Sequence, residues 1–253
     1  MNAVSEIQGK KIFFLHPSTV VQNQIIAELA QQEFEAYVAK NHGTIKIVIK
    51  KYPDSIVFAD IDEGMNENEW ETWIRGIMNA QPDVVIGIIT AVRDEKLMRK
   101  YINNVKIQCG YTLIRSDINR TVADVLEVLK DVNAKGRRKY IRACTKNDSM
   151  ATINVPHGGG FIKGSIKDIS VVGVSCAFEE DPELTKNALF KDIQVKLQTM
   201  LLKVEAIVFG SRMDGNLKIY VLLFTQRIDP DVKTKIRKYV QQNLQSKMDV
   251  ELK

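Results

Sequence analysis

Residues 53–89 read PDSIVFADIDEGMNENEWETWIRGIMNAQPDVVIGII, and this stretch decides the fold of the first half of the chain. Two continuous apolar runs, residues 55–59 and 84–89, have the length of buried strands. Between them, apolar side chains recur at helical spacing from Trp70 to Ile77, and a proline soon follows. A helix between two strands that are apolar throughout predicts a parallel pair of strands covered by helices.

The same alternation of strand and helix continues on both sides of this stretch. Further strands are predicted at residues 11–15, 34–39 and 111–114, and further helical stripes at residues 21–29, 45–52, 97–105 and 121–132. Five strand-then-helix units predict a doubly wound (βα)5 domain over residues 1–134. This part of the sequence has neither a glycine-rich dinucleotide loop nor a P-loop, so nucleotide binding is not indicated there.

The second half changes to short strands that are separated by turns. Six strands are predicted at residues 151–155, 161–169, 171–178, 192–198, 201–210 and 217–225. The glycines at 158–160 are interpreted as a hairpin turn rather than a phosphate loop. After Pro230, an apolar stripe from Val232 to Leu244 predicts one helix. The predicted fold class is therefore α/β plus β, with a second domain at residues 135–253 that is a six-stranded antiparallel β-barrel with a C-terminal helix.

The composition fits a two-domain protein without a membrane span. A length of 253 residues suits two domains that each bury a core. No apolar run approaches the roughly 20 residues of a spanning helix, and the N-terminus lacks the apolar region of an export signal, so a cytoplasmic location is predicted. Cys109, Cys144 and Cys176 show no CxxC spacing. We interpret them as reduced, mostly buried thiols and predict neither a disulfide framework nor a metal site.

The basic residues are concentrated in the second half. Residues 1–134 hold 15 Lys+Arg and 18 Asp+Glu, a net charge of −3, whereas residues 135–253 hold 21 and 13, a net charge of +8. The excess is densest in KGRRKYIRACTK, residues 135–146. Such a cluster favours an anionic partner, which could be nucleic acid, an acidic lipid surface or a small phosphate compound. The alternative is a solvated linker.

Two short motifs occur in this basic half, RRKYIR at residues 137–142 and DISVVG at residues 168–173. They have the forms RxxxR and DxSxxG, and together with the strand-rich body they make the chain resemble the PilZ family. The resemblance implies a barrel that binds the second messenger cyclic di-GMP (c-di-GMP) through Arg138, Arg142, Asp168, Ser170 and Gly173. Arg137 extends the first motif, and in the family such an arginine is associated with two intercalated ligand molecules instead of one.

Each residue type in these motifs can make a specific kind of contact with such a ligand. A guanidinium fork pairs with a phosphate or with guanine O6 and N7, and its flat face stacks on a purine. The Asp168 carboxylate can accept from guanine N1 and N2, which would select guanine over adenine. Ser170 can donate to a phosphate or hold a turn, and Gly173 permits close backbone approach or unusual dihedral angles. Taken singly, these residues are equally explained as surface charges, a turn cap and a β-bulge.

The first half resembles a response-regulator receiver domain, most clearly in PDSIVFADIDEGM, residues 53–65. The resemblance implies that Asp60 holds the position of the phosphoacceptor and that Thr90 holds that of the small hydroxyl residue ending the fourth strand. The first strand, however, ends at His16 instead of an acidic pair, and the fifth is followed by Arg115 instead of a lysine. Magnesium then loses most of its oxygen ligands. We therefore predict a degenerate receiver used for protein contacts, with His16 structural.

These observations predict a non-enzymatic c-di-GMP receptor, with no catalytic residue and no cofactor besides the ligand. Because the arginine motif lies between the two domains, ligand binding is expected to change their arrangement and to signal to an unidentified protein partner. Two alternatives stay open: a nucleic-acid-binding protein that uses the basic junction, and a phosphorylation-driven response regulator that uses Asp60. Trp70 and Trp73 are interpreted as core residues, with a partner surface as the alternative.

Overall fold

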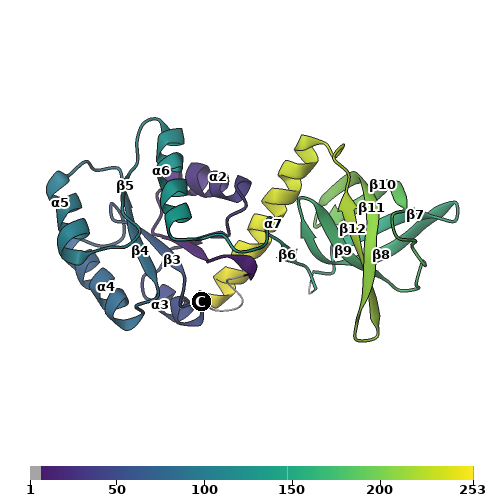
Figure 1. Ribbon diagram of the computed structural model, residues 1–253, viewed down its shortest axis with the longest axis horizontal. Helices are drawn as coiled ribbons and strands as arrows, with labels where there is room; N and C mark the ends of the chain where they lie inside the picture. The colour runs from purple at the N-terminus through teal and green to yellow at the C-terminus, as the bar shows by residue number, and fades with distance from the viewer. Residues whose placement is uncertain (1–6, 147, 253) are drawn as a thin grey trace. The chain divides into compact units, whose positions relative to one another are not determined.

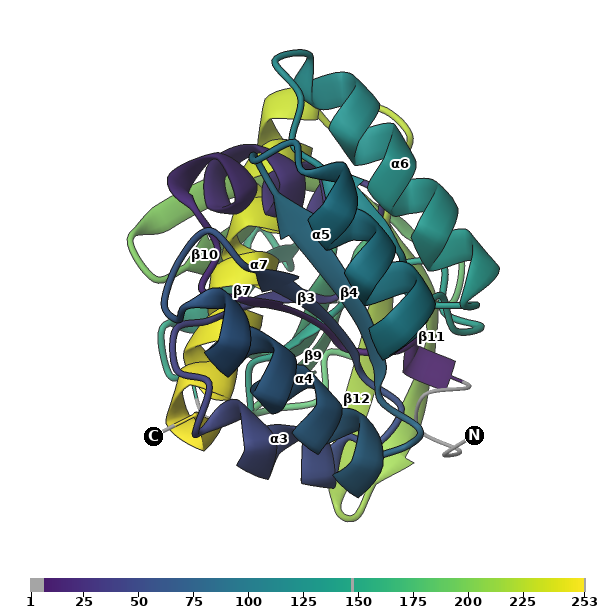
Figure 2. The ribbon, with the colours of Figure 1, turned by 90° about the vertical axis from the view of Figure 1, so that its left-hand side faces the viewer.

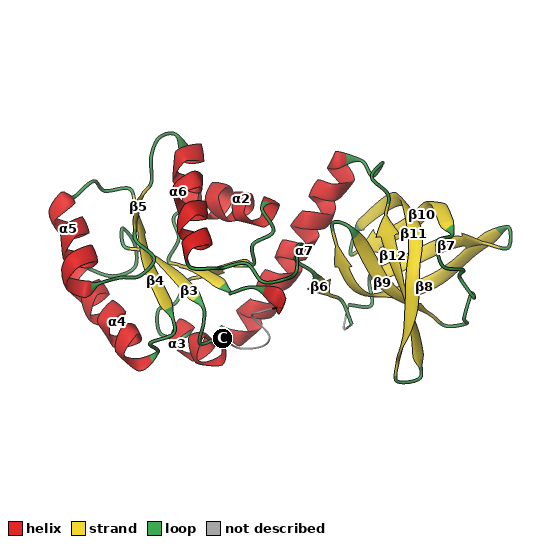
Figure 3. Ribbon diagram, viewed as in Figure 1, coloured by secondary structure: helices red, strands yellow, loops and turns green. Residues whose placement is uncertain are grey.

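The computed structural model describes residues 7–146 and 148–252 of the chain. By its internal contacts the chain divides into two compact units, which are residues 1–139 with 245–253, and residues 140–244. Each unit has its own sheet and its own hydrophobic core. Figure 1 shows the elements by label, and Figure 3 shows that helices dominate the first unit and strands the second.

The first unit contains a five-stranded parallel sheet with the strand order β2-β1-β3-β4-β5. Its strands are β1 (Ile12–Leu15), β2 (Ala36–Ala39), β3 (Ile56–Asp60), β4 (Val85–Thr90) and β5 (Tyr111–Leu113). Every residue of β1 and β3 is buried, as expected of central strands that are covered on both faces. The order is that of doubly wound flavodoxin-like folds, which confirms the predicted (βα)5 receiver-like architecture.

Helical segments follow each of these strands. They are η1 (Val21–Ile25), α2 (Ile26–Gln31), α3 (Ile45–Lys51), α4 (Glu67–Ala80), α5 (Glu95–Arg99), η2 (Lys100–Val105) and α6 (Ile118–Asp131), where η marks π-helical turns. Leu29 of α2 and Val125 of α6 share one core cluster with Ile12 and Phe58, so these two helices cover the same face of the sheet. Figure 2 shows α3 and α4 on the opposite side of the sheet from α6.

The helix α4 starts at a capping box. The Asn66 side chain accepts hydrogen bonds from the backbone N–H groups of Asn68 and Glu69, and the Glu69 carboxylate accepts from the N–H of Asn66. The helix then places Trp70 and Trp73 in the core, where they are 0% and 5% exposed. The interpretation of both tryptophans as core residues is therefore confirmed.

The second unit is a closed antiparallel barrel. Its strands are β7 (Ala151–His157), β8 (Gly160–Ser170), β9 (Gly173–Phe178), β10 (Leu189–Leu197), β11 (Met200–Asp214) and β12 (Leu217–Phe224). They pair in the order β8-β7-β10-β11-β12-β9, and the pairing of β9 with β8 closes the barrel. The predicted six strands are confirmed. A two-residue strand β6 (Ala143–Cys144), which was not predicted, adds to β8.

The helix α7 (Pro230–Glu251) completes the barrel core with Ile236, Tyr239 and Val240. The predicted hairpin turn of glycines is confirmed as well: His157 pairs with Gly160, and the two intervening glycines have φ of 57° and 83°. Two residues with positive φ give the turn that matches the twist of the flanking strands. None of the helices within residues 7–146 and 148–252 has the combination of length and apolar side chains that a membrane span requires.

Candidate functional site

The motif DISVVG forms the hairpin between β8 and β9. Ser170 ends β8 and pairs with Gly173, which begins β9, across a two-residue turn. The Ser170 hydroxyl donates to the Gly173 carbonyl oxygen at 3.4 Å and accepts from the N–H of Val172, also at 3.4 Å. Ser170 is only 4% exposed. Its hydroxyl therefore holds the turn, which is one of the two roles that the sequence suggested.

Gly173 is required by the closeness of a neighbouring strand. A Cβ atom at this position would lie 2.4 Å from the carbonyl oxygen of Leu222 in β12, far inside normal contact distance. The backbone of Gly173 is not in the left-handed region, so the unusual dihedral angles that were considered are not the reason for glycine. The close approach is to the barrel's own backbone.

Arg142 and Asp168 lie beside this hairpin and face each other. Their side chains form an ion pair with 3.6 Å between Nη1 and Oδ1, and they are 46% and 26% exposed. The strand β6 brings them together, because Cys144, two residues after Arg142, pairs with Asp168 of β8. A half-exposed pair of this kind contributes at most about 1 kcal/mol to stability. It does place a guanidinium fork and a carboxylate next to each other at the surface.

The other two predicted arginines lie in the first unit. Arg137 and Arg138 are both exposed, and the amide N–H of Arg138 donates to the carbonyl oxygen of Ile7 at 2.9 Å. The preceding Gly136 packs so closely on Gly9 that a Cβ atom would lie 2.2 Å from its nitrogen. The structure thus brings Arg142 to Asp168 and Ser170 to Gly173, and it anchors the start of the arginine motif by its backbone.

Cys144 follows Arg142 by two residues, but its place opposite Asp168 was not predicted from the sequence. Cys144 is exposed and lies directly across from Asp168, whereas Cys109 and Cys176 are buried. The position follows from the register between β6 and β8. A two-residue strand carries too little periodicity to be recognised in a sequence.

All six predicted site residues lie between positions 136 and 242, and this range matches the sequence profile of the PilZ domain. Residues 136–242 form a PilZ domain. This match confirms the resemblance to the PilZ family that the two motifs indicated. The match includes the arginine segment, the barrel and the first part of α7, so the PilZ domain holds both halves of the candidate site.

Three solved structures are similar to parts of this chain. The PilZ domain of YcgR from Escherichia coli with c-di-GMP is 18% identical to this chain, over 45% of this chain and 98% of that one, with a TM-score of 0.38. The K. pneumonia MrkH–c-di-GMP complex is 19% identical, over 46% of this chain and 57% of that one, with a TM-score of 0.40. A response regulator from Thermotoga maritima is 22% identical, over 48% of this chain and 98% of that one, with a TM-score of 0.40. No curated protein sequence matches the chain.

The carboxyl edge of the first sheet holds the residues of the receiver-like motif. Asp60 is wholly buried, and its carboxylate accepts from the backbone N–H of Ser18 at 2.8 Å. Burial is the main cause that raises the pKa of Asp60, and the neighbouring Asp62 adds to it. The carboxylate of Asp62 in turn accepts from the Thr90 hydroxyl and from the N–H of Ala91, the latter at 2.6 Å. These two donors are therefore already occupied by a carboxylate of the chain itself.

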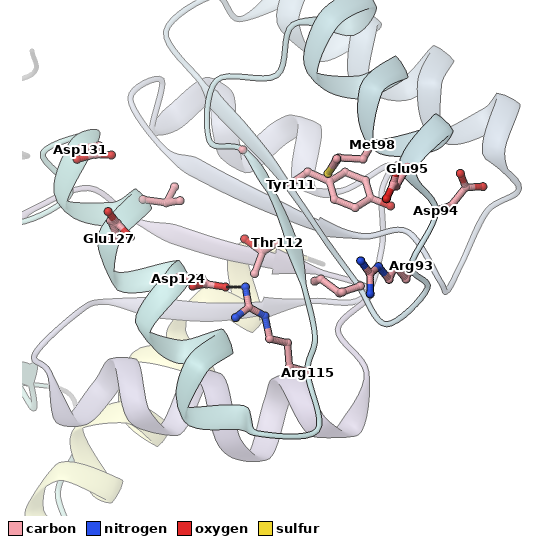
Figure 4. Close-up of a pocket in the computed structure, with 13 residues that line it drawn as sticks. Arg93, Asp94, Glu95, Met98, Tyr111, Thr112, Arg115, Asp124, Glu127 and Asp131 are labelled. Atoms are coloured by element: carbon pink, nitrogen blue, oxygen red, sulfur yellow. Dashed lines mark ion pairs between the residues drawn. The ribbon is translucent and has the colours of Figure 1, made fainter.

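Arg115 and His16 also lie near this edge, where a receiver domain has a lysine and an acidic pair. Arg115 pairs with Asp124 on α6, with 2.7 Å between Nη2 and Oδ2, and Figure 4 shows its side chain directed at that residue. Burial first, and then the neighbouring His42, lower the pKa of His16. Within the described part of the chain there is no group of three or more His, Cys, Asp or Glu side chains suited to a metal ion.

Proposed function

We propose that this protein is a receptor for c-di-GMP, and that the ligand binds to its PilZ domain at Arg142, Asp168 and the β8–β9 hairpin, together with Arg137 and Arg138. The observation that carries the proposal is the surface pair of Arg142 and Asp168 within the PilZ match. The solved structures of YcgR and MrkH named above, both described with c-di-GMP, motivate the choice of ligand.

The chemistry of the pair fits the two parts of this ligand. A cyclic dinucleotide with two guanines offers phosphate oxygens and the acceptors O6 and N7 to a guanidinium, and the donors N1 and N2 to a carboxylate. The ligand would replace the weak contact between Arg142 and Asp168 by charge-assisted hydrogen bonds to each of them, which are stronger than neutral ones. The net charge of +8 on residues 135–253 adds long-range attraction for a doubly charged anion.

The proposed mode of action is a change in domain arrangement without catalysis. The domain boundary between residues 134 and 135 stays a prediction. The role of the arginine segment as a linker between the domains also stays a prediction. In this proposal the ligand binds the arginine segment and the barrel at once, so it favours those domain arrangements in which both contacts form. A protein partner would then recognise the selected arrangement.

Isothermal titration with c-di-GMP tests the ligand site. We expect measurable binding by the wild type and a loss of about tenfold or more in Arg142→Ala, because one bidentate contact contributes about 1–3 kcal/mol. The matched control is Arg99→Ala, which removes an arginine from a surface ion pair on α5 and leaves the affinity unchanged. Equal affinities of wild type, Arg142→Ala and Arg99→Ala would exclude the proposed site.

The nucleic-acid alternative rests on the basic charge of the second half. It predicts DNA or RNA binding that falls steeply with salt and does not respond to c-di-GMP. The phosphorylation alternative predicts labelling by acetyl phosphate that disappears in Asp60→Asn. We expect no such labelling, since Asp62 already occupies the donors of Thr90 and Ala91.

A further inference from the structure

A groove lies at the edge of the first sheet, between the start of α5 and the helix α6. It has a volume of about 490 Å3, and β5 forms its base (Figure 4). Because β5 is the last strand of the sheet, one side of its backbone has no neighbouring strand among the described residues. We refer to this feature as the α5–α6 groove. It lies wholly within the first unit and does not depend on the nucleotide site.

The base of the groove is apolar and partly accessible. Met98, Tyr111, Leu113 and Val128 line it, and each is half-buried rather than fully covered. Burial raises the pKa of Tyr111 to about 12, with smaller contributions from nearby carboxylates, so its hydroxyl remains a neutral donor. Half-buried apolar side chains beside an open strand edge are typical of surfaces that bind an extended segment of another chain.

The walls of the groove are acidic. Asp124, Glu127 and Asp131 follow each other at spacings of three and four residues, so they form one stripe on α6. Figure 4 shows this stripe on one wall and Asp94 with Glu95 on the other. Five carboxylates and two guanidinium groups line the groove, a difference of three negative charges. A concave wall of one sign raises the local concentration of oppositely charged groups.

Three of these carboxylates form no ion pair with another described residue. Asp124 pairs with Arg115, and Glu95 lies 3.7 Å from Arg99. Within the described residues, Asp94, Glu127 and Asp131 take part in no ion pair, and all three are exposed. Neighbouring carboxylates without cations repel each other, and a basic partner would relieve this repulsion.

We propose that the α5–α6 groove binds a Lys/Arg-rich segment of a partner protein, in which apolar residues alternate with the basic ones. The basic residues would pair with the walls, and the apolar residues would cover the base. Nucleic acids and free phosphates carry the wrong sign for this surface. Two copies of the groove would also repel each other, which argues against a symmetric dimer through this face.

The test uses a labelled peptide of alternating lysine and valine, and a matched peptide of alternating glutamate and valine. Fluorescence anisotropy with the 253-residue chain should show binding of the lysine peptide alone, and this binding should weaken as salt is added. We expect Glu127→Lys with Asp131→Lys to weaken it by about tenfold or more. Asp83→Lys with Glu180→Lys makes the same change in charge at two exposed residues outside the groove and should retain the affinity.

A neutral substitution separates the groove from general electrostatic attraction. Met98→Gln keeps every charge but makes the base more polar, and we expect a several-fold loss of affinity for the lysine peptide. Peptide-induced shifts of the Tyr111 and Leu113 amide signals should locate the complex at β5. The proposal is overturned by equal weakening in both charge-reversal variants, or by dimerisation of the wild type that the Glu127→Lys, Asp131→Lys variant abolishes.

Discussion

Gly173 and Leu222 approach so closely that a Cβ atom on Gly173 would lie 2.4 Å from the Leu222 carbonyl oxygen. The two residues lie on adjacent strands, β9 and β12, which pair in antiparallel fashion with Gly173 opposite Leu223. Packing within the barrel therefore requires glycine at this position of the DxSxxG motif, whether or not a ligand binds there. Loss of binding on changing Gly173 would therefore be no proof of a direct contact with the ligand.

Gly173→Ala should destabilise the barrel by about 1–3 kcal/mol, because the added methyl group forces β9 away from β12. Urea unfolding measures the change in the free energy of unfolding. Gly210→Ala is the matched control, since it lies in the same barrel and a Cβ atom there would meet no atom within 4 Å. Equal free energies of unfolding for the two variants would show that β9 and β12 can move apart at little energetic cost.

Asp168→Asn should reduce the preference for guanine. The carboxylate can accept from both guanine donors, whereas an amide has one acceptor and would turn its NH2 group toward the other donor. We expect the affinity for c-di-GMP to fall by about tenfold, and that for cyclic di-AMP to change little. Competition titrations with both nucleotides give the ratio. An unchanged ratio of the two affinities would show that Asp168 does not recognise the base. Contact of Arg142 with the phosphates would still be compatible with that result.

Cys144 provides a chemical reporter of ligand binding. It is exposed opposite Asp168, whereas burial raises the thiol pKa of both Cys109 and Cys176 to about 12, so these two resist alkylation. Saturating c-di-GMP should slow the alkylation of Cys144 several-fold, as followed by mass spectrometry of the intact chain.

The control for this measurement is Arg142→Ala, in which the same nucleotide concentration should give no protection. Protection that persists in this variant would mean that the ligand binds elsewhere on the barrel. Alkylation of Cys144 that is unaffected by nucleotide in the wild type would contradict the placement of the ligand beside β6.

Asp60→Asn should stabilise the first unit near neutral pH. Burial raises the pKa of Asp60 in the folded state, so the folded state takes up a proton more readily than the unfolded state does. The ionised carboxylate therefore costs stability at neutral pH, and this cost disappears as the pH falls toward the unfolded value of about 3.9. Asparagine keeps the shape and an acceptor for the N–H of Ser18.

Thermal unfolding at neutral pH and near pH 4 measures this effect. The Tm of Asp60→Asn should exceed that of the wild type at neutral pH, and the difference should shrink on acidification. A lower Tm of the variant at both pH values would show that the charged carboxylate is stabilised by contacts that outweigh its burial.

The sequence by itself determined the two folds and the positions of the two PilZ motifs. Apolar runs such as residues 55–59 and 84–89 indicated buried parallel strands, and the stripe around Trp70 indicated a helix, because the periodicity of secondary structure is local. The motifs at Arg138–Arg142 and Asp168–Gly173 pointed to the PilZ domain, which the match over residues 136–242 confirms. The contacts of these motif residues with a ligand stay predictions.

The tertiary structure alone decided which residues are neighbours across strands. The pairing of β6 with β8 places Cys144 beside Asp168, and the approach of β12 fixes Gly173 as glycine. At the edge of the first sheet, Asp62 occupies the donors of Thr90 and Ala91, 28 and 29 positions away in the chain. Such contacts depend on register and packing between segments distant in sequence, and no local pattern records them.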